Sequence, residues 1–144
     1  MSIKQISVFL ENRPGTLDEM CALLASHKID LRALSLAEAQ DFGIVRLIVD
    51  DAFATANVLK ENGFVARLTP VLAYAVPDEP GGLSKLLAAF TKASVSIEYM
   101  YAFLGGPNAG HACMIFRVAD AGAAENSLAA AGYKALTQEE IEAI

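Results

Sequence analysis

The segment Glu11–Leu17 reads ENRPGTL, and 66 positions later the segment Pro77–Leu83 reads PDEPGGL. In each segment a Pro-Gly pair separates an apolar run with strand-like alternation from an apolar run with helix-like spacing. The chain matches itself at this offset up to residue 42 and then at an offset of 69, with three extra residues in the loop Gly105–Gly110. A match over this length indicates two copies of one structural unit.

Each copy has the pattern strand, helix, strand, strand, helix, strand. In the first copy the first strand is predicted by apolar residues with a period of two, which are Ile6, Val8 and Leu10. The helix that follows is predicted by apolar residues spaced along one helix face, which are Leu17, Met20, Cys21 and Leu24. Residues 31–38 and 43–50 predict two more strands, and residues 64–70 predict a fourth that leads almost directly into the second copy.

Helix boundaries carry their own signals. Asp51 is placed to cap the start of the second helix, and Gly63 is placed to end it. Near the end of the chain, Thr137 and Glu140 have the spacing of a capping box, which predicts a last short helix.

The element order predicts an α+β fold with two tandem ferredoxin-like βαββαβ units, over residues 1–70 and 71–144. Each unit is expected to have an antiparallel four-stranded sheet with both helices on one face. A unit of about 70 residues buries only roughly 60% of its unfolded surface. We therefore expect the two units to pack as a pseudo-twofold pair, and we expect the chain to form a homodimer.

Composition narrows the function classes. The chain has 144 residues, of which 54% are hydrophobic, and 17 acidic against 11 basic residues give a formal charge of −6. Nucleic acid and anionic membrane surfaces are excluded as partners, because both require clustered Lys and Arg. The first residues are too short and too polar a run for a signal peptide or a membrane span. Two distant cysteines predict free thiols in a reducing cytoplasm.

Catalytic and metal-binding signals are sparse. The two histidines, His27 and His111, have no second ligand at metal-like spacing. Cys21 lies on the predicted apolar helix face, with no base nearby in the sequence to activate it. The sequence therefore predicts no catalytic residue, no metal and no cofactor. Tyr99 and Tyr101 either form an aromatic pocket wall or pack, and their alternation with neighbouring apolar residues favours packing for at least one of them.

Two segments carry a family resemblance, ENRPGTLDEMCALLASHKIDLRALS at 11–35 and PDEPGGLSKLLAAFTKASVSIEYMY at 77–101. Each combines the Pro-Gly pair, the apolar helix face and an apolar-polar-apolar start of the next strand. They resemble the ACT domain, a small ligand-binding module attached to many enzymes of amino-acid metabolism. The resemblance covers essentially the whole chain as two tandem ACT domains. It implies a non-enzymatic protein that binds an amino acid and regulates an enzyme of amino-acid metabolism.

The resemblance also implies where the ligand binds. In the family, an amino acid lies between the first strand–helix loop of one domain and the start of the second strand of its neighbour. By position, the first loop is Asn12, Arg13, Pro14, Gly15, Thr16 and Leu17, the second loop is Asp78, Glu79, Pro80, Gly81, Gly82 and Leu83, and the second-strand starts are Asp30 and Ser96. If the two copies pair with each other, and not with copies in a second chain, one site joins the first loop to Ser96 and the other joins the second loop to Asp30. The family often has Asn at the positions of Asp30 and Ser96, so this chain departs from the family there.

Physical chemistry supports the first of these sites. A helix N-terminus has free N–H groups and partial positive charge, which suit an α-carboxylate, and Gly15 permits close approach to the backbone. The Asn12 amide and the Asp30 carboxylate are suited to accept hydrogen bonds from an ammonium group. Asp78 and Glu79 argue against a carboxylate in the second site. The competing interpretation is that Asn12 and Asp78 only cap their helices.

Three function classes follow. The first is a non-catalytic sensor in which an amino acid at the joint between ACT domains shifts their packing and the activity of a partner. The second is a pair of ACT domains without a ligand that works as a protein–protein assembly module. The third, an enzyme on a ferredoxin-like scaffold, would need a concave cluster of acid, base or nucleophilic residues that the sequence does not offer.

Overall fold

The computed structural model describes residues 2–39, 41–103 and 110–144. The elements in chain order are β1 (Ile3–Glu11), α1 (Thr16–Ser26), β2 (Leu31–Ala39), β3 (Phe42–Val49), α2 (Ala52–Glu61), β4 (Val65–Pro77), α3 (Gly82–Lys92), β5 (Ile97–Phe103), β6 (His111–Val118), α4 (Ala121–Ala130) and α5 (Gln138–Glu142). The chain divides into two compact units, an N-terminal unit (Lys4–Thr69) and a C-terminal unit (Pro70–Ile144 together with Met1–Ile3). Of the predicted loop insertion, all but Gly110 lies outside the described residues.

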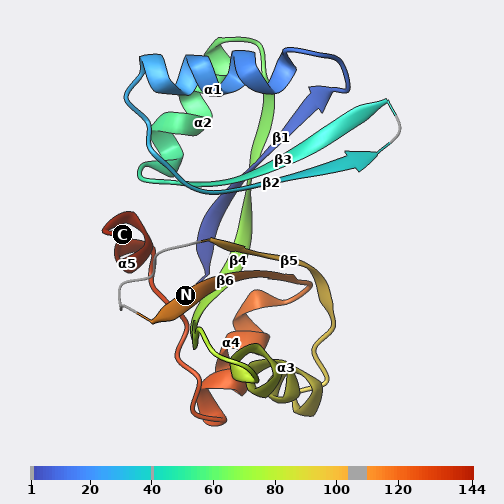
Figure 1. The fold of residues 1–144 in the computed structure, drawn as a ribbon, viewed down its shortest axis with the longest axis vertical. Coiled ribbons are helices and arrows are strands. Elements are labelled where there is room, and N and C mark those ends of the chain that lie inside the picture. Colours follow the sequence, from blue (N-terminus) through green and yellow to red (C-terminus); the bar gives the residue numbers. More distant parts are fainter. Residues whose placement is uncertain (1, 40, 104–109) are drawn as a thin grey trace. The chain divides into compact units, whose positions relative to one another are not determined.

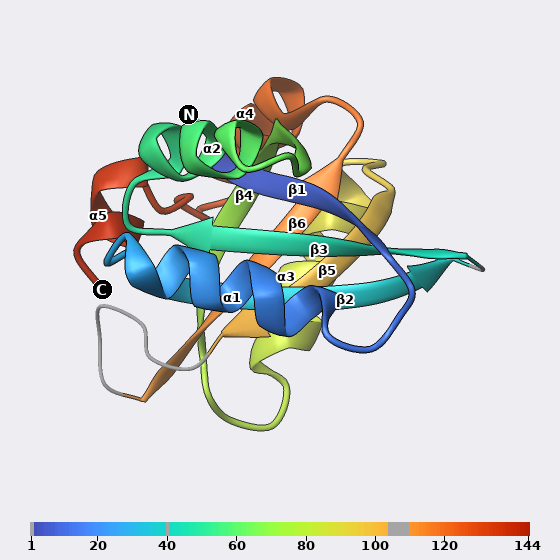
Figure 2. The same ribbon diagram turned by 90° about the horizontal axis from the view of Figure 1, so that it is seen from above.

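The N-terminal unit has the predicted ferredoxin-like order of elements. β3 pairs antiparallel with β1 and β2, with Val8 opposite Val45 and Leu36 also opposite Val45. Helices α1 and α2 lie together on one face of these strands (Figures 1 and 2). Their apolar faces and the facing strand residues form one core, whose buried members are Ile6, Val8, Leu10, Met20, Leu24, Val45, Leu47, Val49, Ala52 and Leu59. Of the residues that predicted β1 and α1, Leu17 and Cys21 pack partly buried against this core and the others are buried in it.

The C-terminal unit repeats this plan around a more aromatic core. β6 pairs antiparallel with β4 and β5, and α3 and α4 cover one face of these strands (Figure 1). The rings of Tyr74, Phe90 and Phe116 contact one another, with centroids 4.8 to 6.2 Å apart. Met100 packs against the same core, whereas the alternating Tyr99 and Tyr101 do not belong to it and are half-buried.

The prediction of two four-stranded sheets is wrong, because the strands form one hydrogen-bonded series of six in the order β2-β3-β1-β4-β6-β5. The predicted fourth strand of the first copy and first strand of the second merge into β4, which is 13 residues long. Pro70 lies within it without a neighbouring turn residue and favours an extended conformation before it. The last predicted strand is absent from residues 132–136. That segment offers one backbone bond to β4, from Leu136 N to Ala73 O (2.8 Å), before α5 begins.

Corresponding helix ends are built alike in the two units. The carboxylates of Asp51 and Asp120 each accept a hydrogen bond of 3.0 Å from the backbone N–H three residues later. The capping box of Thr137 with Glu140 is confirmed, as is the short helix α5 that it begins. After α1 and α3, Lys28 and Ser94 adopt left-handed φ values of 58° and 55°. Non-glycine residues rarely adopt this conformation, so both chain reversals carry local strain.

Candidate functional site

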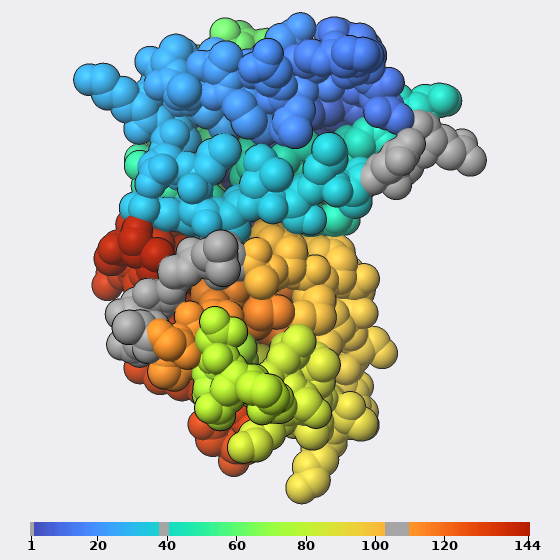
Figure 3. Space-filling view, in the orientation of Figure 1, coloured from blue at the N-terminus to red at the C-terminus, as the bar shows by residue number. Residues whose placement is uncertain are grey.

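The loop Glu11–Leu17 joins β1 to α1 and folds on its own backbone. Its tight turn is closed by a hydrogen bond from Arg13 N to Glu11 O (2.9 Å), and Gly15 reverses the chain with φ 92°. The hydroxyl of Thr16 lies 3.0 Å from Glu11 O and 3.2 Å from Arg13 O, and donates toward these carbonyls. Figure 3 shows this part of the chain (dark blue) at the surface. The loop is therefore both ordered and accessible.

The interpretation of Asn12 and Asp78 as helix caps is wrong. The N-cap positions are Gly15 for α1 and Gly81 for α3, and neither helix has a side-chain capping bond. Pro14 and Pro80 precede these glycines, outside the helices. The side chains of Asn12 and Asp78 are thus not needed to start α1 and α3.

A small cavity of about 160 Å³ lies against the Glu11–Leu17 loop. Five of the predicted site residues line it, namely Asn12, Arg13, Gly15, Thr16 and Leu17. Pro14 does not line it. This volume is below the roughly 300 to 1,000 Å³ of sites for drug-sized ligands. It suits a molecule no larger than a small amino acid.

Charges of both signs surround this cavity. The guanidinium of Arg13 is 3.2 Å from a carboxylate oxygen of Glu11 and 3.6 Å from one of Glu19. Asp18 also lines the cavity, in the first turn of α1. The first turn of α3 carries no acidic residue. The loop therefore offers a cation for a carboxylate and carboxylates for an ammonium, but the acidic residues at the start of α1 weaken its attraction for a simple anion.

The sequence reasoning missed five residues that line this cavity: Leu10, Glu11, Asp18, Leu36 and Gly43. Gly43 lies opposite Leu10 in the β1–β3 pairing, and Leu36 lies on β2, the neighbour of β3. A Cβ at Gly43 would come within 3.1 Å of Leu36 Cδ1. Pairing the predicted hairpin 31–38 and 43–50 with the first strand would have placed Leu36 and Gly43 beside the loop.

The second loop, Pro77–Leu83, repeats the backbone of the first but not its side chains. Glu79 N donates to Pro77 O (2.9 Å), and Gly81 has φ 87°. Gly82 occupies the position of Thr16 and is buried. A Cβ at Gly82 would lie 2.2 Å from Pro77 O. The second loop is thus closed tightly at a point where the first loop accommodates a threonine.

Asp30 and Ser96, the predicted partners of these loops, follow the opposite ends of α1 and α3. α1 has 11 residues and is about 16 Å long, so one small ligand does not contact both Asp30 and Asn12 within the N-terminal unit. Asp30 is held by Arg32, whose Nη1 lies 2.7 Å from its Oδ2. The pairing of the first loop with Ser96, and of the second with Asp30, stays a prediction.

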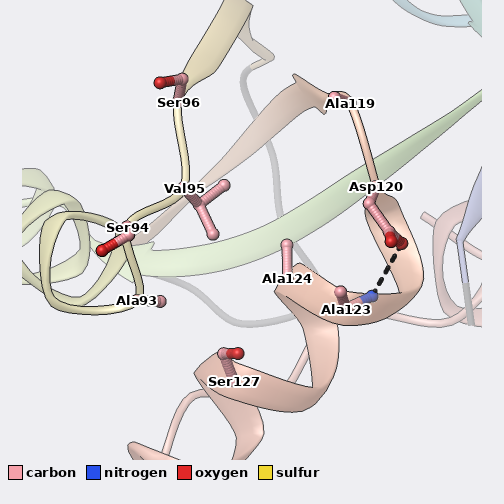
Figure 4. Close-up of a pocket in the computed structure, with 9 residues that line it drawn as sticks. All are labelled: Ala93, Ser94, Val95, Ser96, Ala119, Asp120, Ala123, Ala124 and Ser127. Atoms are coloured by element: carbon pink, nitrogen blue, oxygen red, sulfur yellow. Dashed lines mark hydrogen bonds between the residues drawn. The ribbon is translucent and has the colours of Figure 1, made fainter.

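Ser96 lines a cavity of about 400 Å³ in the C-terminal unit, between the end of α3 and the start of α4 (Figure 4). The walls are small residues, and the one charged wall residue, Asp120, accepts the capping hydrogen bond from Ala123 N. In the N-terminal unit the residue that corresponds to Ala119 is Asp50. Its carboxylate accepts a hydrogen bond from the backbone N–H of Asp30.

The cysteines do not resemble nucleophiles. Burial raises the pKa of the Cys113 thiol to about 12, and burial together with the nearby charge of Asp18 raises the pKa of Cys21. Both shifts oppose formation of the reactive thiolate. Within the described residues, no group of three or more His, Cys, Asp or Glu side chains is placed to hold a metal ion. No helix of the described chain is long and apolar enough to cross a membrane.

Comparison with known proteins finds a family whose model matches this chain. A family model described as "ACT domain pair" matches residues 1–143. Among solved structures, protein BT0572 from Bacteroides thetaiotaomicron is 35% identical, with a TM-score of 0.92 and a match that covers 100% of this chain and 98% of that chain. No curated protein matches the chain.

Two further solved structures share the fold at lower identity. The ligand-free regulatory subunit of aspartate kinase from Thermus thermophilus is 18% identical, with a TM-score of 0.64, and the match covers 90% of this chain and 92% of that one. The regulatory subunit of aspartate kinase from Thermus flavus is 15% identical, with a TM-score of 0.60 and coverage of 92% and 94%. At these identities the likeness concerns the fold alone.

Proposed function

The chain belongs to the ACT domain pair family, and from this premise we propose that it is a non-catalytic regulatory protein whose Glu11–Leu17 loop binds a small amino acid. The observation that carries the proposal is the cavity of about 160 Å³ at this loop, which is lined by Arg13 and Asp18. A guanidinium and a carboxylate on the walls of a small cavity complement the two charges of a zwitterion. The apolar wall residues Leu10, Leu17 and Leu36 suit an aliphatic side chain.

The ligand acts by linkage in this proposal. An amino acid that binds one conformation of the chain more tightly than another shifts the population toward that conformation, by no more than its differential affinity. A partner protein that contacts the favoured conformation then responds to occupancy. We propose an enzyme of amino-acid metabolism as that partner, a homodimer as the working assembly and the cytoplasm as its location.

Thermal unfolding against the twenty amino acids and the related 2-oxo acids tests the binding. At about 100 times its Kd, a ligand that binds only the folded chain adds roughly 2.7 kcal/mol to the free energy of unfolding. We expect a selective increase in Tm with one or a few small amino acids. The corresponding 2-oxo acids, which lack the ammonium group, should give a smaller increase.

Two matched variants locate the site. Asn12→Ala should abolish the ligand-dependent increase in Tm, whereas Asp78→Ala, at the equivalent position of the second loop, should retain it. Neither side chain caps a helix, so both variants should fold. A flat response of the wild-type chain to the whole panel would contradict the proposal, and an increase that survives Asn12→Ala would move the site away from this loop.

A protein–protein assembly module is the second candidate. The guanidinium of Arg13 already pairs with the carboxylates of Glu11 and Glu19, and this pairing weakens its attraction for a ligand carboxylate. Leu36 and Phe42, on β2 and β3, are 54% and 43% exposed, as apolar contact residues would be. Under this alternative no amino acid changes Tm, and light scattering at micromolar concentration shows a stable oligomer that Leu36→Lys dissociates.

A further inference from the structure

Two walls of the cavity at the Glu11–Leu17 loop come from the β2–β3 hairpin, and these are Leu36 and Gly43. Gly43 is buried inside β3, where it pairs with β2 on one side and lies opposite Leu10 of β1 on the other. A glycine inside a strand weakens the strand, and it often marks a bulge or a place where a ligand or another segment comes close. The surroundings of Gly43 distinguish these explanations.

The backbone does not require a glycine at position 43. Its φ is not in the left-handed region, and the register of β3 is regular there against both neighbouring strands. The one register shift in the β2–β3 pairing lies elsewhere, between Leu31 and Ala33. A side chain at position 43 would instead meet Leu36, because an added Cβ would lie 3.1 Å from Leu36 Cδ1. Gly43 therefore leaves room for the side chain of Leu36 and for the cavity beside it.

Leu36 is a large apolar residue that the chain leaves 54% exposed. Leu34, two positions earlier on the same face of β2, is 39% exposed but does not line the cavity. A ligand side chain in the cavity would cover part of the Leu36 surface, which is favourable in proportion to the apolar area removed from water. Leu36 is therefore placed to contact a ligand, whereas Leu34 is a matched leucine without that contact.

The internal repeat provides a comparison for these two positions. By the offsets of the repeat and by the strand pairings, Ala112 corresponds to Gly43 and Ala102 corresponds to Leu36. The first unit thus combines a glycine with a leucine where the second unit combines two alanines. A strand at this place accepts a Cβ when the facing side chain is short. The pair in the first unit therefore serves the shape of the cavity and not the pairing of the strands.

We propose that Leu36 and Gly43 set the size of the side chain that the cavity accepts, and that its ligands are α-amino acids with short aliphatic side chains, from alanine to valine. This inference rests on the function proposed for the loop. Arg13 and Asp18, on the cavity wall, engage the carboxylate and the ammonium that all amino acids share, so they do not discriminate among them. Discrimination comes from the apolar walls, where Gly43 gives a ligand side chain room and Leu36 limits its length.

Isothermal titration calorimetry with glycine, alanine, 2-aminobutyrate, valine, leucine and phenylalanine tests the proposal. The wild-type chain should bind alanine, 2-aminobutyrate or valine most tightly, and leucine and phenylalanine at least about tenfold more weakly. Gly43→Ala adds a methyl group to the wall and should weaken valine relative to alanine by about 10-fold to 200-fold. Leu36→Ala shortens the opposing wall and should strengthen leucine relative to alanine by at least about tenfold. Each result is a ratio of two Kd values within one variant, so the folded fraction does not affect it.

Matched variants control for effects away from the cavity. Leu34→Ala, on the same face of β2, and Ala112→Gly, at the equivalent position of the second unit, should leave these ratios unchanged. Gly43→Ala should lower Tm because the new Cβ presses on Leu36, and the double variant with Leu36→Ala should recover part of the loss. Leu36→Ala alone changes an exposed side chain, so it keeps the test decisive if Gly43→Ala does not fold.

The outcomes separate this inference from the function on which it rests. A preference that Gly43→Ala moves toward shorter side chains and Leu36→Ala toward longer ones supports it. Wild-type binding whose preference neither variant changes, or that Leu34→Ala changes as much, overturns the inference and leaves the function of the loop standing. Wild-type binding of leucine and phenylalanine as tight as that of alanine does the same. Absence of binding for every amino acid, in the wild-type chain and in the variants, overturns both.

Discussion

The two Pro-Gly loops of this protein share a backbone and differ in chemistry. Both close with a hydrogen bond of 2.9 Å across the turn, and both reverse at a glycine with φ near 90°. Around that backbone, Arg13 in the first loop corresponds to Glu79 in the second, and Thr16 corresponds to Gly82. One loop has a cation and a hydroxyl beside a small cavity, whereas the other has consecutive acids and a glycine packed on a carbonyl.

This difference teaches that the Pro-Gly pair specifies a conformation and not a function. Gly15 and Gly81 are needed for the positive φ, and any family member with this turn needs a similar residue. What the loop binds depends on the side chains on either side of the pair. Duplication has kept the first requirement in both copies and has let the second diverge.

The largest expected effect comes from making the second loop like the first at its tightest point. Gly82→Thr places a Cβ where Pro77 O lies 2.2 Å away, so the loop must open and the free energy of unfolding should fall by about 3 kcal/mol. The reverse change, Thr16→Gly, removes only hydrogen bonds at a partly exposed site and should cost about 1 kcal/mol. Urea denaturation measures both. Equal losses would mean that the two loops are equally open.

The next largest effect concerns the charge that distinguishes the loops. Arg13→Gln should abolish the roughly 2.7 kcal/mol of stabilisation by a saturating amino acid, because it removes the guanidinium at the cavity. Glu79→Gln, the matched change in the second loop, should leave that stabilisation intact. Isothermal titration calorimetry of both variants measures the affinity for the amino acid, and thermal unfolding with and without the amino acid measures the stabilisation. Binding that is lost in Glu79→Gln but retained in Arg13→Gln would assign the ligand to the second loop.

A moderate and equal effect is expected where the loops are the same. Gly15→Ala and Gly81→Ala each force an L-residue into a left-handed conformation, at φ 92° and 87°. Each should lower the free energy of unfolding by about 1 to 2 kcal/mol. Neither added Cβ meets an atom closer than 3.9 Å, so sterics beyond the backbone do not contribute. Unequal losses in thermal or urea unfolding would break the equivalence of the two turns.

The smallest expected effect is an increase in the free energy of unfolding, at the C-terminal ends of α1 and α3. Lys28→Gly and Ser94→Gly relieve the left-handed strain at φ 58° and 55°, partly offset by the greater freedom of glycine in the unfolded chain. Each should raise the free energy of unfolding by about 0.5 to 1 kcal/mol. Gly63→Ser and Gly132→Ser, at the corresponding ends of α2 and α4, should lower the free energy of unfolding by a similar amount. A loss of stability in Lys28→Gly would show that the lysine side chain makes contacts worth more than the strain.

Much of the fold was predictable because its signals are local. The period in β1, the helix face of α1, the cap Asp51 and the capping box of Thr137 depend on residues within a few positions of one another, and the structure confirms each. The number of strands was not predictable in this way. Whether Pro70 interrupts a strand, and whether residues 132–136 pair with β4, depend on pairing with strands that are distant in the sequence.

The candidate site divides in the same manner. The predicted loop residues do lie together, because they are neighbours in sequence and the Pro-Gly turn holds them. Leu36 and Gly43 were missed, since they reach the loop only through the pairing of β1, β2 and β3. The capping interpretation of Asn12 and Asp78 failed because the glycine that reverses the chain takes the N-cap position itself.

The sequence by itself determined the repeat, the order of the elements within the first unit, the two Pro-Gly turns and the family resemblance, because periodicity, turn residues and caps act over short stretches of chain. Only the tertiary structure decided which side chains surround each loop, that β4 is one strand, and that the hydroxyl of Tyr74 is buried without a hydrogen-bond partner among the described residues. Those outcomes depend on strand register and on the packing of residues far apart in sequence. The free energies that set register and packing belong to pairs of segments, and no single stretch of sequence contains them.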